Sequence, residues 1–188
     1  LNAMETVSLM IEAGQIEYGL IVDGEGAREF IERTIERLKS PDVDVDTFYK
    51  NFATLTLGSG AVAMLLCHKD KATTTHILNG GVKLAATEHN RLCFGQRDFL
   101  FTDAKALLVA GVDLAAKTWK VANKKILNWS DKTIDKYIPH QVSQANTRAL
   151  IKTLELTLDK FSLTFPTLGN IGPASLPITL AIAAEKCV

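Results

Sequence analysis

Apolar residues recur every three or four positions in five stretches of the chain. This spacing places them along one face of a helix and therefore predicts amphipathic helices. The expected helices cover residues 4–13, 27–39, 104–125, 142–156 and 174–186. Gly14 is a suitable C-terminal stop for the first helix, and Thr102-Asp103 supplies N-terminal caps for the third.

Other apolar stretches are short and predict strands. The expected strands cover residues 18–22, 61–67, 73–86 with an interruption at Gly80-Gly81, 136–139 and 161–165. Residues 41–46 and 90–101 are expected to be loops. From residue 73 onward strands and helices alternate, a pattern that favours an α/β fold with a mainly parallel sheet covered by helices.

This layout is compatible with a duplicated α/β module. We expect residues 1–70 to be the C-terminal part of a first half, and residues 71–188 to be a second half without its last strands. The chain opens inside a helical pattern and stops directly after an apolar helix. We therefore expect a fragment, incomplete at both ends, whose half-sheet has open edges and is prone to aggregate.

Composition and charge narrow the classes of partner. The 188 residues are 47% hydrophobic, and 21 basic residues balance 21 acidic ones, so no net field favours nucleic acid or an anionic membrane. No apolar run reaches the roughly 18 residues that span a bilayer, and no secretory signal is present, so a cytoplasmic location is expected. Cys67, Cys93 and Cys187 are widely spaced, which predicts free thiols rather than disulfides or a metal site.

Candidate chemistry lies at two strand-to-helix junctions in the last third of the chain. His140 follows one predicted strand, and Asn170, preceded by Gly169, follows another. Equivalent junctions lie at the same edge of a sheet, so the two side chains can project into one pocket. An imidazole N–H and a carboxamide NH2 could then donate to the same oxygen. The alternatives are a hydrogen-bonded histidine at a strand end and a turn asparagine.

Three motifs carry a family resemblance. Residues 137–141 read Tyr-Ile-Pro-His-Gln, residues 169–177 read Gly-Asn-Ile-Gly-Pro-Ala-Ser-Leu-Pro, and residues 57–63 read Leu-Gly-Ser-Gly-Ala-Val-Ala. Their order and separation resemble the thiolase superfamily and, within it, ketoacyl synthase III. Residues 140–143, 165–175 and 85–89 further resemble the condensing enzymes that start long-chain olefin biosynthesis by joining two fatty acyl-CoA molecules.

The resemblance implies a thiolase-like fold and a homodimeric acyltransferase that performs a Claisen condensation of acyl-CoA or acyl-carrier-protein substrates, without metal or cofactor. His140 and Asn170 would stabilise the enolate oxygen. The family's nucleophilic cysteine would lie upstream of Leu1, so none of the three cysteines present is assigned this role, and the chain alone would be inactive. Supporting roles, near the histidine or in shaping the backbone, are implied for Asn146, Gly169, Gly172, Gly58 and Gly60.

Two other readings stay open. The first is a decarboxylative 3-oxoacyl synthase III, which extends an acyl-CoA with malonyl-carrier protein. The second is a non-catalytic relative that serves as a dimer partner or an acyl-binding subunit. A nucleotide-binding α/β domain is disfavoured because the sequence has no Gly-x-Gly-x-x-Gly or Gly-Lys-Ser/Thr string.

Overall fold

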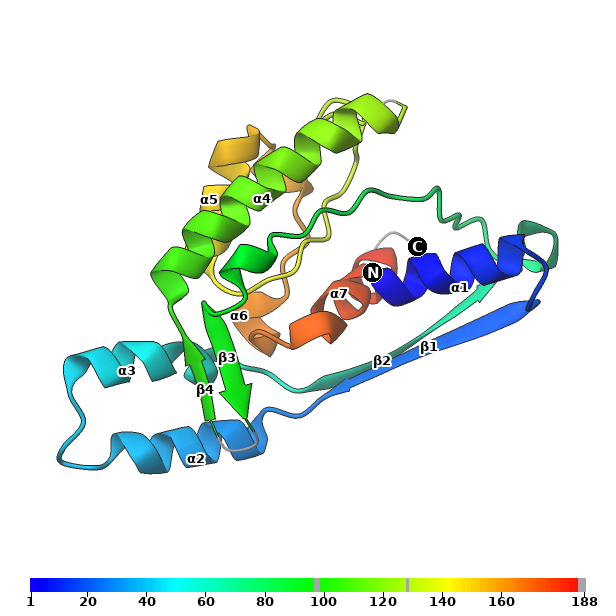
Figure 1. The fold of residues 1–188 in the computed structure, drawn as a ribbon. Helices are drawn as coiled ribbons and strands as arrows, with labels where there is room; N and C mark the ends of the chain where they lie inside the picture. Colours follow the sequence, from blue (N-terminus) through cyan, green and yellow to red (C-terminus); the bar gives the residue numbers. More distant parts are fainter. Residues whose placement is uncertain (97–98, 128, 186–188) are drawn as a thin grey trace.

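Helices dominate the fold, and the named strands form two antiparallel pairs (Figure 1). The computed structural model describes residues 1–96, 99–127 and 129–185. The helices are α1 (Asn2–Glu12), α2 (Arg28–Leu38), α3 (Val45–Phe52), α4 (Ala104–Lys125), α5 (Gln144–Leu154), α6 (Phe165–Leu168) and α7 (Ser175–Glu185). Short 3-10 turns are η1 (Ala53–Thr56), η2 (Lys69–Lys71), η3 (Thr87–His89), η4 (Leu158–Lys160) and η5 (Gly172–Ala174). The strands are β1 (Tyr18–Glu25), β2 (Gly60–Cys67), β3 (Cys93–Gln96) and β4 (Phe99–Thr102).

The long pair β1–β2 forms the floor on which α1 and α7 lie (Figure 1). Its register runs from Tyr18 opposite Cys67 to Glu25 opposite Gly60. The strands approach both helices closely: a methyl group at Gly19 would overlap Val7 of α1, and one at Gly60 would lie 2.9 Å from the Ile178 side chain of α7. Small residues on this face therefore bring the helices down onto the sheet.

Among the described residues, none covers the opposite face of β1–β2, which is apolar. Side chains alternate between the two faces of a strand, and the outward set includes Leu20, Val22 and Leu65. Their exposed fractions are 64%, 69% and 64%. The expected strands 18–22 and 61–67 are thus confirmed, but their pairing leaves one face of the sheet open.

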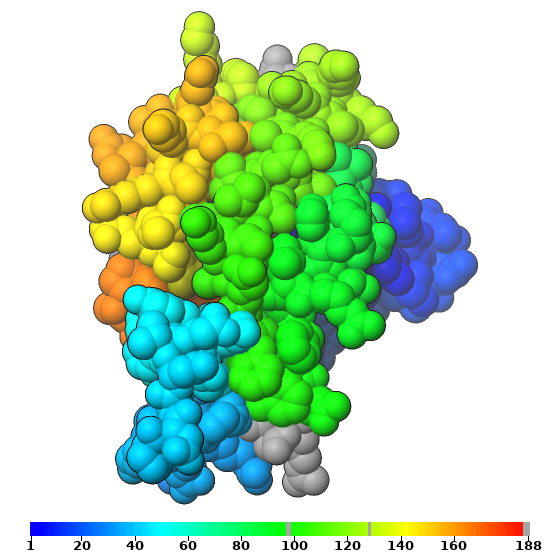
Figure 2. Space-filling view, turned by 60° about the vertical axis from the view of Figure 1, so that its left-hand side comes forward, coloured from blue at the N-terminus to red at the C-terminus, as the bar shows by residue number. Residues whose placement is uncertain are grey.

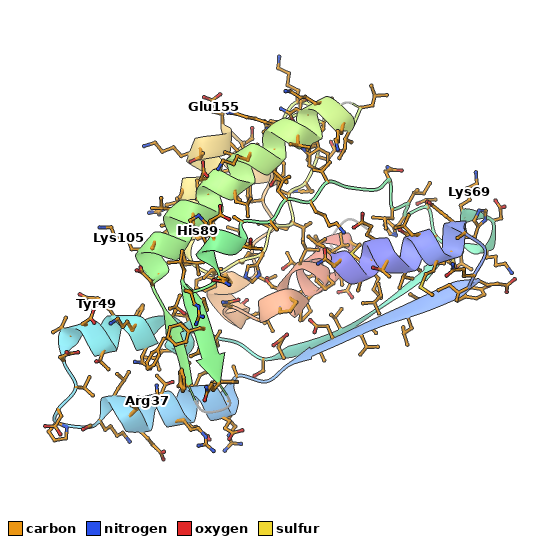
Figure 3. All side chains as sticks on the ribbon, viewed as in Figure 1. Arg37, Tyr49, Lys69, His89, Lys105 and Glu155 are labelled. Carbon is orange, nitrogen blue, oxygen red and sulfur yellow. The ribbon has the colours of Figure 1, made fainter. Side chains whose placement is uncertain are left out.

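The second pair, β3–β4, stands beside α2 and α3 (Figure 1). Phe94, Phe99 and Phe101 pack on one another across it, with ring centroids 4.9 to 6.3 Å apart. The Arg37 guanidinium lies 5.8 Å from the Phe101 ring centroid, and Figure 3 shows Arg37 on α2 below this pair. Prediction of a loop over 90–101 was wrong in its described part because cross-strand aromatic packing stabilises a hairpin there.

Helix α3 was not expected from the sequence. Residues 41–46 were assigned to a loop, but Asp44 is the N-cap of this helix, and its Oδ1 accepts a hydrogen bond from the Thr47 backbone N–H at 2.7 Å. An aspartate in that position satisfies one of the free N–H groups of the first turn. The expected loop therefore ends at Asp44, and Asp46 already belongs to the first turn of the helix.

Parallel pairing is much scarcer than the sequence suggested. Residues 73–86 are irregular, and within the described ranges the parallel pairs are the isolated bridges Tyr137–Phe161 and Leu57–Asn170. A strand needs a neighbour for its N–H and C=O groups, and residues 73–86 find none in the part of the chain that is described. The strands expected at 73–86, 136–139 and 161–165 were therefore wrong as continuous strands.

Helices α4 and α5 pack side by side and form a second layer. Figure 2 shows α4 in green beside α5 in yellow, with α3 in cyan below them. Fully or almost fully buried side chains form two groups: Gln141, Ile171, Ala174, Ser175 and Thr179 around η5 and α7, and Thr34, Asn51 and Thr54 on α2, α3 and η1. Among the helices described, none has the length and apolar character needed to cross a membrane.

Candidate functional site

Asn170 is held in place by backbone pairing with a segment more than a hundred residues earlier in the chain. Its N–H donates to the Thr56 carbonyl at 2.9 Å, and its own carbonyl accepts from the Gly58 N–H at 2.8 Å. Two glycines permit this approach. A methyl group at Gly58 would overlap the Leu168 carbonyl oxygen, and Gly169 has a φ of 71° that few other residues adopt.

The side chain of Asn170 is also oriented. Its Oδ1 accepts a hydrogen bond from the Gly172 N–H at 3.1 Å. This short Asx turn is compatible with the left-handed φ of 52° at Gly172. Because Oδ1 is engaged, the NH2 end of the carboxamide remains as the donor that a ligand oxygen could use.

The same turn contributes to the surroundings of His140. It follows the Tyr137–Phe161 bridge by three residues. Desolvation lowers the pKa of the imidazole, and a weaker hydrogen-bonding contribution from the Gly172 backbone raises it. The Gly172 turn is thus the element common to the surroundings of both residues, and of the two only Asn170 lines the cavity described next.

A cavity of about 420 Å³ lies along this turn. Its lining is mostly apolar and comes from β1, α2, the β3–β4 hairpin and the Asn170 turn. The lining residues are Glu25, Gly26, Ala27, Phe30, Leu57, Gly58, Gly95, Gln96, Phe99, Leu100, Asn170 and Gly172. An apolar cavity whose lining includes a few polar side chains, Glu25, Gln96 and Asn170, suits a ligand that has an aliphatic chain and a polar group.

Glu25 is the residue of this cavity that the sequence reasoning missed. It ends β1, and its carboxyl group lies so close to Gly172 that a methyl group there would be 3.2 Å from the Glu25 Cδ atom. Burial, and then the nearby charge of Asp23, raise the pKa of Glu25. The alternation of acidic residues and glycines over 23–26 was the available signal, but the predicted strand stopped at residue 22.

The remaining site candidates have local structural contacts. Asn146 lies in the first turn of α5, where its backbone N–H donates to the Ser143 Oγ at 3.1 Å. Gly60 lets β2 pack against α7, as described above. Ser143 and Asn146 thus form the N-terminal cap of the helix that follows His140.

Metal-ligand clusters are absent from the described residues: no group of three or more His, Cys, Asp or Glu side chains there could hold an ion. Cys67, on β2, and Cys93, on β3, are free thiols. The Cys93 Sγ lies 3.4 Å from the Thr102 hydroxyl. Cys187 and the expected end of the last helix at Lys186 lie outside the described residues.

Comparison with known proteins identifies relatives of this chain. Residues 125–187 match the family model of the 3-oxoacyl-[acyl-carrier-protein] synthase III C-terminal domain. An acyl-CoA:acyl-CoA alkyltransferase of Xanthomonas campestris is 42% identical over 185 residues, which are 98% of this chain and 54% of that protein. Its namesake from Shewanella oneidensis is 36% identical, over 99% of this chain and 56% of that protein. The chain thus spans about half the length of these relatives.

Solved structures similar to this chain include those of the Xanthomonas enzyme OleA. The Xanthomonas OleA structure with bound lauric acid and lauroyl-CoA superposes with a TM-score of 0.93 at 42% identity, over 98% of this chain and 54% of that one. A histidine-to-alanine variant of OleA gives a TM-score of 0.93 at 41% identity, again over 98% and 54% of the two chains. These matches confirm the thiolase-like fold and the resemblance to ketoacyl synthase III and its olefin-forming branch.

Proposed function

We propose that this chain, with its thiolase-like fold and its likeness to acyl-CoA:acyl-CoA alkyltransferases, is the part of a Claisen-condensing acyltransferase that stabilises the enolate. The observation that carries the proposal is the Gly172 turn: its N–H orients the Asn170 side chain, which lines an apolar cavity, and its backbone also contributes to the pKa of His140. Two fatty acyl-CoA molecules are the proposed substrates, and a β-ketoacyl compound is the product.

The reaction proceeds in two half-reactions. A cysteine thiolate, expected upstream of Leu1, attacks the carbonyl of the first acyl-CoA and releases CoA, which leaves an acyl-enzyme. The second acyl-CoA gives a proton from the carbon next to its thioester to a general base of the complete protein. The resulting carbanion attacks the acyl-enzyme carbonyl, so a carbon-carbon bond forms and the cysteine thiolate leaves.

His140 and Asn170 act in the second half-reaction. Removal of the proton places negative charge on the thioester oxygen of the second substrate. The lowered pKa of His140 keeps its imidazole neutral near pH 7. To donate to the enolate, its single N–H would turn from the Gly172 backbone to the substrate oxygen, and the Asn170 NH2 supplies a second donor. Fixed donors in a site that excludes water are each worth about 3 to 4 kcal/mol of barrier.

The test uses the complete protein that contains these residues. Long-chain acyl-CoA alone is supplied, free CoA is followed with a thiol reagent, and the lipid product is identified by mass spectrometry. A β-keto acid or its ketone supports the proposal. Strict dependence on malonyl-carrier protein would move the function to decarboxylative 3-oxoacyl synthase III, and failure to form an acyl-enzyme would favour a non-catalytic partner.

Three further features belong to the same proposal. A division into two thiolase-like halves at residues 70 and 71 fits the end of β2 at Cys67. The family resemblance implies a homodimer, a cytoplasmic location remains the expectation drawn from the sequence, and a role in lipid biosynthesis follows from the product. Light scattering of the complete protein would test the dimer.

A further inference from the structure

Gln141, the residue after the candidate histidine, is fully buried, with no exposed surface. Its carboxamide makes four hydrogen bonds, two through Oε1 as acceptor and two through Nε2 as donor. The donors to Oε1 are the Thr164 N–H at 2.8 Å and the Phe165 N–H at 3.0 Å, and the acceptors from Nε2 are the Ser162 carbonyl at 3.1 Å and the Thr179 hydroxyl at 3.3 Å. The hydrogen-bonding capacity of a primary carboxamide is thus fully used.

Two threonines extend these bonds to the last helix. The hydroxyl groups of Thr164 and Thr179 lie 2.7 Å apart, and Thr179 Oγ1 also donates to the Ser175 carbonyl at 2.7 Å. Thr164, Thr179 and Ser175 are all buried. The Gln141 side chain is therefore fixed against α7 and has no water-exposed alternative.

The two N–H groups bound by Oε1 lie at the start of α6, where a helix has no partners of its own for its first N–H groups. This helix has a single turn and ends at Gly169, directly before Asn170. Gln141 therefore caps the element that presents Asn170, while its own backbone adjoins His140. One side chain thus connects the two segments that carry the proposed donors.

We infer that Gln141 is a positioning residue that sets the separation between His140 and Asn170. This inference rests on the proposed function, because it assigns Gln141 to the condensation half-reaction alone. Gln141 touches no reacting atom. Its effect arises because misplacement of a donor by about 1 Å can cost roughly 100-fold in rate.

The experiment measures the two half-reactions separately in the complete protein. Gln141→Met keeps the approximate length of the side chain and removes all four hydrogen bonds. We expect acyl-enzyme formation, followed by intact-protein mass spectrometry, to stay within about 3-fold of wild type, and condensation to fall by about 10- to 100-fold. Thr179→Val is a milder change that removes one partner of Gln141, and it serves as the test if Gln141→Met fails to fold. We expect it to shift the ratio of the two rates in the same direction by a smaller factor.

Asn51 provides a matched control. It is the other fully buried amide side chain among the described residues, and it joins α2 to α3 by accepting from Arg37 and donating to the Thr47 carbonyl at 2.8 Å. Asn51→Leu should change both half-reactions by the same factor. An unchanged ratio in Gln141→Met and Thr179→Val would overturn the inference, whereas a wild-type protein with neither activity would overturn the proposed function first.

Discussion

The two ends of the Asn170 carboxamide have different proposed roles, and substitutions at this position can distinguish the role of the oxygen from that of the NH2 group. Oδ1 maintains the turn by accepting from the Gly172 N–H at 3.1 Å, and the NH2 group is the proposed donor to the enolate oxygen. Asn170→Asp keeps an acceptor for Gly172 but replaces the donor with a second oxygen. Asn170→Ala removes both functions.

The expected losses differ in size. Removing one fixed donor costs about 100- to 1,000-fold in the condensation rate, or about 2.7 to 4 kcal/mol. Asn170→Asp also adds a negative charge beside the developing enolate. Two like charges about 4 Å apart at an effective dielectric constant of about 20 repel by about 4 kcal/mol, which is nearly another 1,000-fold. Condensation should therefore fall in the order wild type, Asn170→Ala, Asn170→Asp, although the aspartate variant preserves the turn better.

The assay is single-turnover condensation of a pre-formed acyl-enzyme with a second acyl-CoA, with the β-ketoacyl product quantified by mass spectrometry. Acyl-enzyme formation in the same samples reports whether each variant is folded and competent in the first half-reaction. If Asn170→Asp condensed as fast as wild type, or faster than Asn170→Ala, the amide NH2 could not be the donor to the enolate.

Four further predictions concern stability, measured by thermal or denaturant unfolding. The pKa of His140 is lowered in the fold, so stability should be full above about pH 6.5 and fall as pH drops toward the lowered pKa, and His140→Gln should flatten this profile. Hydrogen bonds from Thr157 lower the pKa of Asp131 to about 2, so its contribution is present above pH 3.8, is lost as pH falls through 2, and should be missing in Asp131→Asn. Gly58→Ala should unfold at much lower denaturant, because its methyl group would overlap a backbone carbonyl; an unchanged midpoint would contradict that overlap. Glu155→Gly should stabilise by about 0.5 to 1 kcal/mol, since Glu155 has a φ of 54° at the end of α5, where Figure 3 shows it; a loss of stability would argue against strain there.

The parts of the fold that could be predicted are those in which local pattern and local energy agree. Helix α4 begins one residue after its predicted Asp103 cap and follows its apolar stripe to the predicted end at Lys125. Strand β2, Gly60–Cys67, likewise coincides with the apolar run from which a strand over 61–67 was predicted. The helices expected at 4–13, 27–39, 142–156 and 174–186 are likewise confirmed, with shifted ends, over their described residues.

Pairing between strands could not be predicted, because the partner of a strand is set by distant residues. The sequence indicated parallel strands after residue 73, but the longest pairing joins Tyr18–Glu25 to Gly60–Cys67 in antiparallel register. Between these strands lie two helices, α2 and α3, so no tight turn marks them as a pair. The hairpin at β3–β4 was missed because each strand has only four residues, and aromatic residues alternate on β4 alone, while β3 contributes only Phe94.

The candidate site shows a similar division. His140 and Asn170 stood out because they lie in recognisable strings next to prolines and glycines. Glu25 and Gln141 could not be assigned from the sequence alone, because what distinguishes them is their surroundings: the turn at Gly172 for one and a ring of buried polar groups for the other. Burial and partner geometry arise only when segments far apart in the chain come together.

The ring of bonds around Gln141 also constrains how this sequence can change over generations. Gln141, Thr164 and Thr179 each satisfy a polar atom of another member inside the core. Replacing one of them with an apolar residue leaves a buried donor or acceptor without a partner, at a cost of about 1 to 3 kcal/mol, and replacing all three would still leave the Thr164 and Phe165 backbone N–H groups without the acceptor that Gln141 supplies. Substitutions at these three positions therefore depend on one another. An evolving sequence that changes them one at a time passes through single mutants that are less stable.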